Sequence, residues 1–561
     1  MNPRASRVLL ATLACLGVLS SAAWAQAVPT PGQVREQLRP TPTVPTTTPP
    51  SVSAPAPGAA AGVPTGGRAV LVSAFEISGN RAIGTDELQQ VIAPFAGRPL
   101  TIAEIYEAAD ALTRHYRTQG YTLASAYVPQ QKISSGVIHI EILEGTLGAV
   151  QVEGTRRTRA AFVNWQLDRL HPGEPLRDEP LQNELLLLND IPGLDAKAVV
   201  RPGAEFGSSD LVLTAQEDLF DANARYNNYG RESIGEERLE AGAGLNGLLG
   251  VGDRLDVNGV YAEGDLLHYG RLAYSLPVSP WGTRASVYYA AWDYKVNSKR
   301  LGAGLELLDI AGEGDNFGVR VDHPVWRTTT HNLYVGFGID RTNTDQRERA
   351  FGTRTQQDLT LASVNALFTY LAPDQSFSTL GATFSTNFNG AEREIVPPGI
   401  LGVENNAQTA KLQFDLSHYR PVFRQLSLLT RFTGVVSVDP LVDLERFRIG
   451  GPNSVRGYAA AEFAGDSGYF LSFELQHPIP FVTAVPTLLK GFFDTGTVHN
   501  KNHNLLGVKD SQSLSGAGVG LQTSLYQKIF IDLAVAQPIG AHDSSDTDRG
   551  ARFWMNVSAN F

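Results

Sequence analysis

Residues 448–468 read RIGGPNSVRGYAAAEFAGDSG. This stretch is too polar and too rich in glycine for a β-strand, yet residues 469–475 after it alternate apolar and polar positions as a strand does. A second motif, Phe493-Asp494-Thr495-Gly496, follows about one strand pair later. Arg456 in the loop and Asp494 in that strand carry opposite charges. The spacing predicts a loop that folds back and is pinned to a wall of strands.

The wall would be built from residues 218–561. Segments such as 284–294, 412–417 and 426–438 alternate apolar and polar residues, and the turns between them carry Gly, Asp, Asn and Pro. The last segment alternates as well and ends on Phe561, so it needs a partner strand, which in a barrel is the first strand. At about 20 residues per strand and turn, this region accommodates roughly 16 strands. We expect a transmembrane antiparallel β-barrel; a soluble array of β-sandwiches is the alternative.

Two α+β units are expected before the barrel. Residues 69–145 read as strand, helix, helix, strand, strand, with a capping box at Thr101 and Glu104 and with Gly120 placed to end the second helix. The paired strands at its end are expected at 121–128 and 136–143. Residues 146–217 repeat the same order of elements without close sequence similarity, which indicates an internal repeat.

The N-terminus reads as an export signal and a linker. Residues 1–25 have two arginines, an apolar run and Ala23-Trp24-Ala25, the layout of a signal peptide. The chain's single cysteine, Cys15, lies inside it, so the exported chain needs neither disulfides nor thiolate metal sites. Residues 26–68 are rich in Pro, Thr, Ala and Ser and cannot bury a core. Within them, residues 33–39 could form two helical turns.

The composition argues against some classes of partner and favours a chain of many strands. The chain carries 46 basic and 57 acidic residues, a net charge of −11, which argues against nucleic acid as a partner. No apolar run long enough for a transmembrane helix follows the signal. The 55 glycines, 25 phenylalanines and 18 tyrosines against only two methionines are typical of many short strands.

With these features the chain resembles the outer-membrane transporters of two-partner secretion, the haemolysin and filamentous-haemagglutinin secretion proteins, within the superfamily of BamA-like assembly factors. The resemblance covers residues 70–561. Its carriers are the two α+β units, which look like POTRA domains, and a set of short motifs in a fixed order. The motifs are Ser78-Gly79-Asn80, Glu144-Gly145, Asn228-Tyr229-Gly230, the LLGVGD of residues 248–253, Val455-Arg456-Gly457-Tyr458 and Phe493-Asp494-Thr495-Gly496.

The resemblance implies a cellular location and a function. It implies the outer membrane of a Gram-negative bacterium, POTRA domains in the periplasm, and secretion of one dedicated, unfolded exoprotein through the barrel without ATP. It implies that Arg456 pairs with Asp494 on the inner wall, with Gly457, Tyr458 and Gly496 shaping that contact. It also implies a pore-plugging N-terminal helix, for which residues 33–39 are the candidate.

Partners follow from the same resemblance. The exoprotein would carry an N-terminal secretion domain, and a POTRA edge strand would bind it by strand addition. The barrel-assembly machinery would insert the chain into outer-membrane lipid, with Phe561 as the C-terminal strand signal. No cofactor, metal or enzymatic activity is expected, and the kind of exoprotein stays open: an adhesin, a cytolysin, a contact-dependent toxin or a haem-binding protein.

Several other interpretations compete with this one. An assembly factor for other barrels would need more than two POTRA units, and a diffusion porin would need none. The Gly465-Asp466-Ser467-Gly468 segment is similar to the nucleophile segment of serine proteases, yet it comes without a protease-type histidine segment. Residues 242–247 match GxGxxG, but a strand follows instead of a helix. His499 and His503 have a metal-like spacing in a polar loop with no evident third ligand.

Overall fold

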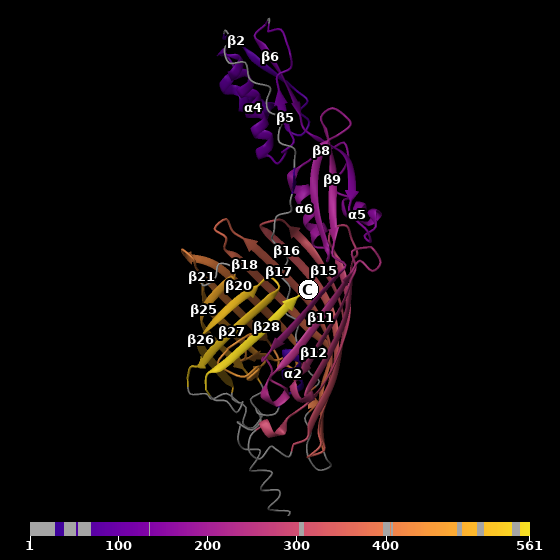
Figure 1. Ribbon diagram of the computed structural model, residues 1–561, viewed down its shortest axis with the longest axis vertical. Coiled ribbons are helices and arrows are strands. Elements are labelled where there is room, and N and C mark those ends of the chain that lie inside the picture. Colours follow the sequence, from indigo (N-terminus) through magenta and orange to yellow (C-terminus); the bar gives the residue numbers. More distant parts are fainter. Residues whose placement is uncertain are drawn as a thin grey trace, which may run out of the picture.

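The structure is a computed structural model that describes residues 29–38, 52–53, 69–133, 135–301, 308–396, 404–405, 408–479, 485–501, 510–540 and 550–561. The predicted signal peptide and most of the predicted linker lie outside these residues. Two small α+β units stack end to end over one mouth of a barrel (Figure 1). The short helix α2 (Pro31–Gln37) lies within the barrel, far from the α+β units that follow it in sequence (Figure 1).

The first α+β unit packs helices on a small sheet of order β3-β6-β5, with β2 and β4 forming a separate pair. The long helix α4 begins at a capping box, in which the Thr101 hydroxyl accepts the Glu104 N–H and the Glu104 carboxylate accepts the Thr101 N–H. Its apolar face buries Leu112 and Tyr116 against β6. The elements are β2 (Val70–Val72), β3 (Ala74–Ser78), α3 (Thr85–Ile92), η1 (Ala93–Phe95), β4 (Arg98–Leu100), α4 (Ile102–Thr118), β5 (Ser125–Tyr127) and β6 (Val137–Leu143).

Two elements of this unit differ from expectation. The strand predicted over 121–128 shortens to Ser125–Tyr127, because the Ala124 N–H bonds to the Tyr121 carbonyl and closes a turn there. The first of the two expected helices, over residues 85–95, is α-helical only to Ile92 and continues as a 3₁₀ turn, since Pro94 has no N–H to continue the α-helical ladder.

The second α+β unit has a four-stranded sheet of order β1-β8-β9-β7. Its edge strand β1 (Val52–Ser53) comes from the linker and pairs in parallel with residues 198–199 of β8. The linker thus adds a strand to this sheet. The unit's own elements are β7 (Thr146–Glu153), α5 (Ala160–Gln166), α6 (Asp178–Asn189), β8 (Leu194–Pro202) and β9 (Ser208–Glu217).

The barrel closes with sixteen antiparallel strands, plus the two-residue segment β19 (Glu404–Asn405), and this confirms the predicted fold class. β28 pairs with β10 from Asn223↔Asn560 to Asn227↔Asn556, and the Phe561 N–H donates to the Ala222 carbonyl. The sixteen strands are β10 (Phe220–Asn227), β11 (Arg238–Asn246), β12 (Arg254–Ala262), β13 (Leu267–Pro277), β14 (Arg284–Lys295), β15 (Ile310–Arg327), β16 (His331–Glu348), β17 (Thr353–Leu371), β18 (Phe377–Ile395), β20 (Ala410–Phe423), β21 (Leu426–Ser437), β24 (Ser467–Pro478), β25 (Thr487–His499), β26 (Ser511–Leu525), β27 (Ile529–Pro538) and β28 (Arg552–Asn560).

The barrel wall is two-faced. Side chains such as Phe317, Phe337 and Leu272 are exposed on the outside, whereas the intervening positions are turned to the lumen, where many are polar. Short 3₁₀ turns occur in its loops: η2 (Glu232–Ile234), η3 (Glu263–Asp265) and η4 (Ser298–Arg300). In the described part of the chain we find no helix with the length and apolar character needed to span a bilayer.

The second α+β unit is seated on the turns at the near mouth of the barrel. The Asp190 carboxylate, just after α6, accepts hydrogen bonds from Nε and Nη2 of Arg327, each at 2.7 Å. Arg327 is almost fully buried. The Asn183 amide donates to the Arg327 carbonyl at 2.6 Å. Leu187 packs so closely against Gly282 that an added Cβ would lie 2.6 Å from it. A partly buried ion pair and tight packing therefore hold this unit on the barrel.

Candidate pore-loop site

The loop between β21 and β24 folds into the barrel. It contains η5 (Asp443–Glu445) and a small hairpin of β22 (Phe447–Ile449) and β23 (Phe463–Gly465). Apolar loop side chains join wall side chains in one buried cluster, which consists of Ile449, Val455, Tyr458 and Phe463 from the loop and Phe470, Val498 and Leu514 from the wall. The loop is therefore packed inside the lumen.

Arg456 is the main polar contact between the loop and the wall. Its Nε and Nη2 donate to the two oxygens of Asp494 at 2.7 and 2.9 Å, and its main-chain N–H donates to the same carboxylate at 3.2 Å. Arg456 is 6% exposed and Asp494 is fully buried. A guanidinium so far from water is stabilised by a bidentate, charge-assisted contact of this kind.

Gly457 and Gly496, beside this contact, let the backbones of the loop and the wall approach each other closely. A Cβ at Gly496 would lie 3.0 Å from the Tyr469 carbonyl and 3.1 Å from the Ile449 side chain. A Cβ at Gly457 would lie 2.9 Å from the main-chain nitrogen of Pro538 on β27. Tyr458 is buried in the loop cluster. The structure thus brings together all five residues that the sequence placed at this contact.

Three wall residues complete the contact and were not among those named from the sequence. Glu474 accepts a hydrogen bond from Arg456 Nη1 at 2.6 Å, so two carboxylates share one guanidinium. The Arg456 guanidinium carbon also lies 3.3 Å from the centre of the Phe492 ring. The Trp554 indole N–H donates to the Arg456 carbonyl at 2.6 Å. Glu474 could have been found, since it shares the polar face of its strand with Ser472, which pairs in register with Asp494.

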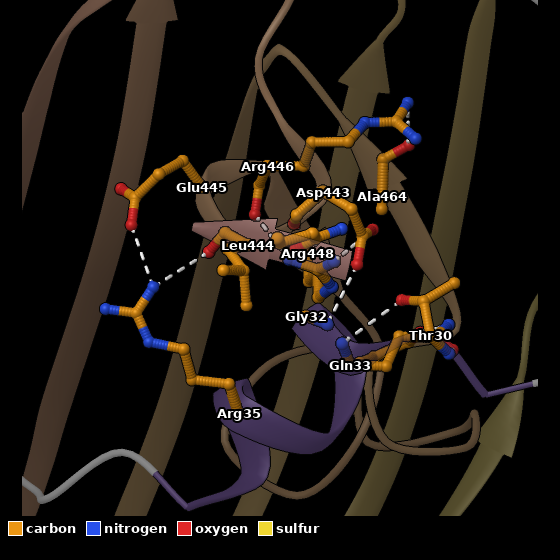
Figure 2. Close-up of polar contacts among 12 residues, drawn as sticks. Thr30, Gly32, Gln33, Arg35, Asp443, Leu444, Glu445, Arg446, Arg448 and Ala464 are labelled. Atoms are coloured by element: carbon orange, nitrogen blue, oxygen red, sulfur yellow. Dashed lines mark hydrogen bonds and ion pairs between the residues drawn. The ribbon is translucent and has the colours of Figure 1, made fainter. Parts of the chain in front are cut away.

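The same loop holds helix α2 (Figure 2). The Gly32 N–H donates to Asp443 Oδ2 at 2.8 Å, and Arg35 Nη1 donates to Glu445 Oε1 at 2.9 Å. On the other side of the loop, the Gln33 amide donates to the Ala461 carbonyl at 2.8 Å. An added Cβ at Gly32 would lie 2.5 Å from the Asp443 carbonyl, so the helix backbone is in direct contact with the loop.

The opposite face of α2 is packed against the barrel wall. Val34 is fully buried in a cluster with wall side chains that include Trp292, Tyr294 and Ile310. The Arg238 guanidinium of β11 donates to Gln37 Oε1 at 2.5 Å. The helix is consequently clamped between the inward loop and the wall.

The position of α2 corrects the helix predicted over residues 33–39. The helix spans Pro31–Gln37 and begins earlier because Thr30 forms a capping box with Gln33 and because Pro31 suits the first helical turn. Arg39 lies outside the described residues.

The other sequence candidates have structural contacts. Asp466 accepts the N–H groups of Leu441 and Lys501, and the Ser467 hydroxyl accepts the Ser437 N–H, so this segment fastens the loop to neighbouring strands. His503 lies outside the described residues. Within the described ranges, no group of three or more His, Cys, Asp or Glu side chains is placed to hold a metal ion.

Comparison with known proteins places the chain in a family. The profile of the haemolysin secretion/activation proteins ShlB/FhaC/HecB matches residues 207–523, and that of the ShlB-type POTRA domain matches residues 70–145. The chain belongs to the ShlB/FhaC/HecB family of haemolysin secretion/activation proteins. It is an outer-membrane transporter of two-partner secretion, with POTRA domains in the periplasm and a secreted exoprotein as its partner.

Relatives and solved structures agree with the family. The heme/hemopexin transporter protein HuxB of Haemophilus influenzae is 23% identical, over 86% of this chain and 85% of its own. The outer membrane transporter CdiB of Escherichia coli is 26% identical, over 84% and 79%. The solved structure of CdiB from Escherichia coli covers 90% of this chain and 93% of its own with a TM-score of 0.67 and 22% identity. BamA from Haemophilus ducreyi shares the fold, with a TM-score of 0.55, 17% identity and coverage of 88% of this chain and 100% of its own.

Proposed function

We propose that this transporter releases one dedicated exoprotein through its lumen after α2 leaves its position, and that the Arg456 contact holds the inward loop in place meanwhile. The observation that supports this is that one loop carries both contacts. Its Asp443 and Glu445 bind α2, while its Arg456 binds Asp494 and Glu474 on the wall. Pinning the loop therefore also fixes the surface on which the helix docks.

Strand addition to the POTRA domains is the proposed way of taking up the exoprotein. Of the two strands considered from the sequence, β6 lies between β3 and β5 and has both edges paired, whereas β5 is at the end of its sheet. In the second domain, β8 already pairs with linker residues 52–53, so its edge is able to accept an extended segment. Main-chain hydrogen bonds at these edges would hold an unfolded chain, and folding outside the cell would prevent its return.

Biogenesis is part of the same proposal. Phe561 ends the strand that closes the barrel, and its main chain bonds to Ala222 of the first strand. We infer that the barrel-assembly machinery recognises this last strand and inserts the chain into outer-membrane lipid.

The test is secretion of this transporter's exoprotein by Arg456→Ala and Asp494→Ala variants. Arg456→Ala leaves Asp494 and Glu474 buried without the guanidinium, which costs on the order of 3–5 kcal/mol, and Asp494→Ala leaves Arg456 with Glu474 as its one carboxylate partner among these residues. We expect secretion to fall at least tenfold. Arg456→Lys should restore little of it, because an ammonium group cannot bond two carboxylates in the same fork geometry.

A matched control separates loop pinning from general damage to the barrel. Lys490 and Asp532 form another ion pair of the lumen at 2.6 Å, in which Lys490 is buried and the Asp532 side chain is 34% exposed, and neither contact is to the loop. Lys490→Ala should therefore keep most secretion. Secretion near the wild-type level from both the Arg456 and Asp494 variants would remove the proposed role of the contact.

A further inference from the structure

The outer face of the barrel carries a polar groove that the secretion function does not use. The groove has a volume of about 1050 Å³ and crosses β13 to β18. Among its lining residues are Tyr289, Asp293, Glu313, Asp315, Asn343 and Arg393. These positions face outward, because they keep the alternation of the exposed wall side chains. On β14, for example, Trp292 lies in the lumen cluster, while Tyr289 is exposed on the other face.

The groove lies where the lipid-facing apolar surface ends. On β15 the outward side chains Val321, Val319 and Phe317 are followed, toward the extracellular end, by Asp315 and Glu313. At about 3.3 Å per residue, Asp315 lies within roughly 7 Å of the last apolar ring. The polar headgroup zone of a bilayer begins at this height.

The neighbouring strand shows the same change from apolar to polar outward side chains. On β16 the apolar Phe337 and Ile339 give way to Arg341, Asn343 and Asp345. The groove is therefore continuous with the apolar band below it, and a ligand in it would have a polar end and an apolar end.

Three arginines on β16 and β17 border the groove, and each pairs with an acidic side chain that lines it. Arg341 pairs with Asp358 at 3.0 Å, and Arg347 pairs with Glu313 at 3.1 Å. Arg354 donates to Asp345 at 2.8 Å. The three arginine side chains are 58%, 52% and 41% exposed. Exposed pairs of this kind contribute about 0–1 kcal/mol, so a phosphate can replace the carboxylate in a bidentate contact.

The remaining groups suit a sugar. Carboxylates accept hydrogen bonds from sugar hydroxyls, the amides of Asn343 and Gln356 both donate and accept, and Tyr289 adds an aromatic ring. Phosphate, sugar and acyl chain occur together in one component of the outer leaflet. We propose that this groove binds the phosphorylated sugar headgroup of lipopolysaccharide, whose acyl chains lie along the apolar band.

The test measures lipopolysaccharide bound to the full-length transporter purified from outer membranes. Native mass spectrometry gives the amount retained, and re-addition of lipopolysaccharide to delipidated protein gives the affinity. We expect the triple variant Arg341→Gln/Arg347→Gln/Arg354→Gln to bind at least fivefold less. The control is Arg271→Gln/Arg320→Gln on β13 and β15, because these arginines face the lumen beside Tyr288 and Gly338.

Further arms define the ligand. The triple arginine-to-lysine variant keeps the charge and should retain most of the binding, which guards against a glutamine variant that folds poorly. Dephosphorylated lipopolysaccharide should bind the wild type as weakly as intact lipopolysaccharide binds the glutamine variant, and inorganic phosphate alone should not displace the lipid. Equal binding by wild type and triple variant would overturn the proposal. So would unchanged lipid binding with reduced exoprotein release, because the groove would then serve the emerging cargo.

Discussion

At the scale of single residues, the buried carboxylates at the Arg456 contact and the buried carboxylate of Glu184 differ in what stabilises them. Asp494 and Glu474 share the guanidinium of Arg456, and each accepts hydrogen bonds from it. Glu184 on α6 of the second POTRA domain is fully buried, and its carboxylate oxygens accept no hydrogen bond from the described residues. Arg169 lies 3.6 Å from one of its oxygens. Burial raises the pKa of the Glu184 carboxyl to about 7, although Arg169 lowers it and Asp168 raises it further.

This pKa predicts a pH-dependent POTRA domain. The folded-state value lies above the unfolded value of about 4.3, so the carboxyl contributes stability below that value and loses it as the pH rises through 7. We expect the free energy of opening of α6, measured by hydrogen exchange and corrected for intrinsic rates, to fall by on the order of 3 kcal/mol between pH 4.5 and 7.5.

Two variants distinguish the titration of Glu184 from that of other groups. Glu184→Gln should abolish most of this slope, whereas Glu179→Gln should keep it, because Glu179 lies on the same helix with its side chain 80% exposed. An identical slope in wild type and Glu184→Gln would mean that another group titrates.

Some residues of the Arg456 contact could be predicted from the sequence, and others could not. Arg456 and Asp494 could be paired in advance because an arginine in a glycine-rich loop and an aspartate in a strand stand out from their surroundings. Phe492 and Trp554 could not be named, because nothing in an alternating strand distinguishes an aromatic ring that meets the loop from one that packs elsewhere. Their roles depend on strand register and on the path of the loop.

At the scale of elements, α2 depends on contacts far away in sequence. It has only seven residues and would be marginal in isolation. Its stability comes from the loop on one side and the Val34 cluster on the other. The sequence predicted a short helix nearby, yet its docking partners on the loop follow more than 400 residues later and those on the wall about 200 or more residues later, and no local pattern reports such contacts.

Gly32 gives a test of this docking. Because a side chain there would meet the Asp443 carbonyl and the Arg448 guanidinium, Gly32→Val should force α2 off the loop. Overpacking of about 2 kcal/mol would shift the docking equilibrium roughly thirtyfold. In planar bilayers we expect a several-fold increase in the time for which the pore conducts ions.

The control is Gly491→Val on β25, where an added Cβ meets no atom within 4 Å. This variant should conduct like the wild type. Unchanged conductance of Gly32→Val, with α2 still protected from exchange, would show that the helix does not block the pore.

At the scale of the whole molecule, the second POTRA domain is fixed to the barrel by the Asp190 to Arg327 pair. Removing one partner of a fully buried pair costs about 3–5 kcal/mol and an exposed pair contributes under about 1 kcal/mol, so this pair, with Arg327 buried and the Asp190 side chain 24% exposed, lies between these limits. We expect Arg327→Met to broaden the distance distribution between spin labels at residues 197 and 526, both of which are exposed. The single cysteine lies in the predicted signal peptide, so two introduced cysteines would be the only labelling sites in the exported chain.

Arg349→Met is the matched control, because Arg349 pairs with Asp309 at an exposed position away from the seat. It should leave the distribution narrow. An equally narrow distribution for Arg327→Met would show that packing, such as that between Leu187 and Gly282, is enough to hold the domain.

The way the barrel closes ties its completion to the order in which the chain is made. The seam joins residues 223–227, near the start of the barrel sequence, to residues 556–560, which leave the ribosome after the other fifteen barrel strands. Each new strand can pair with the one before it, but the first strand has to wait for the last. Until β28 pairs with β10 the barrel has an open strand edge, so a chain that lacks residues 552–560 could not become a sealed cylinder.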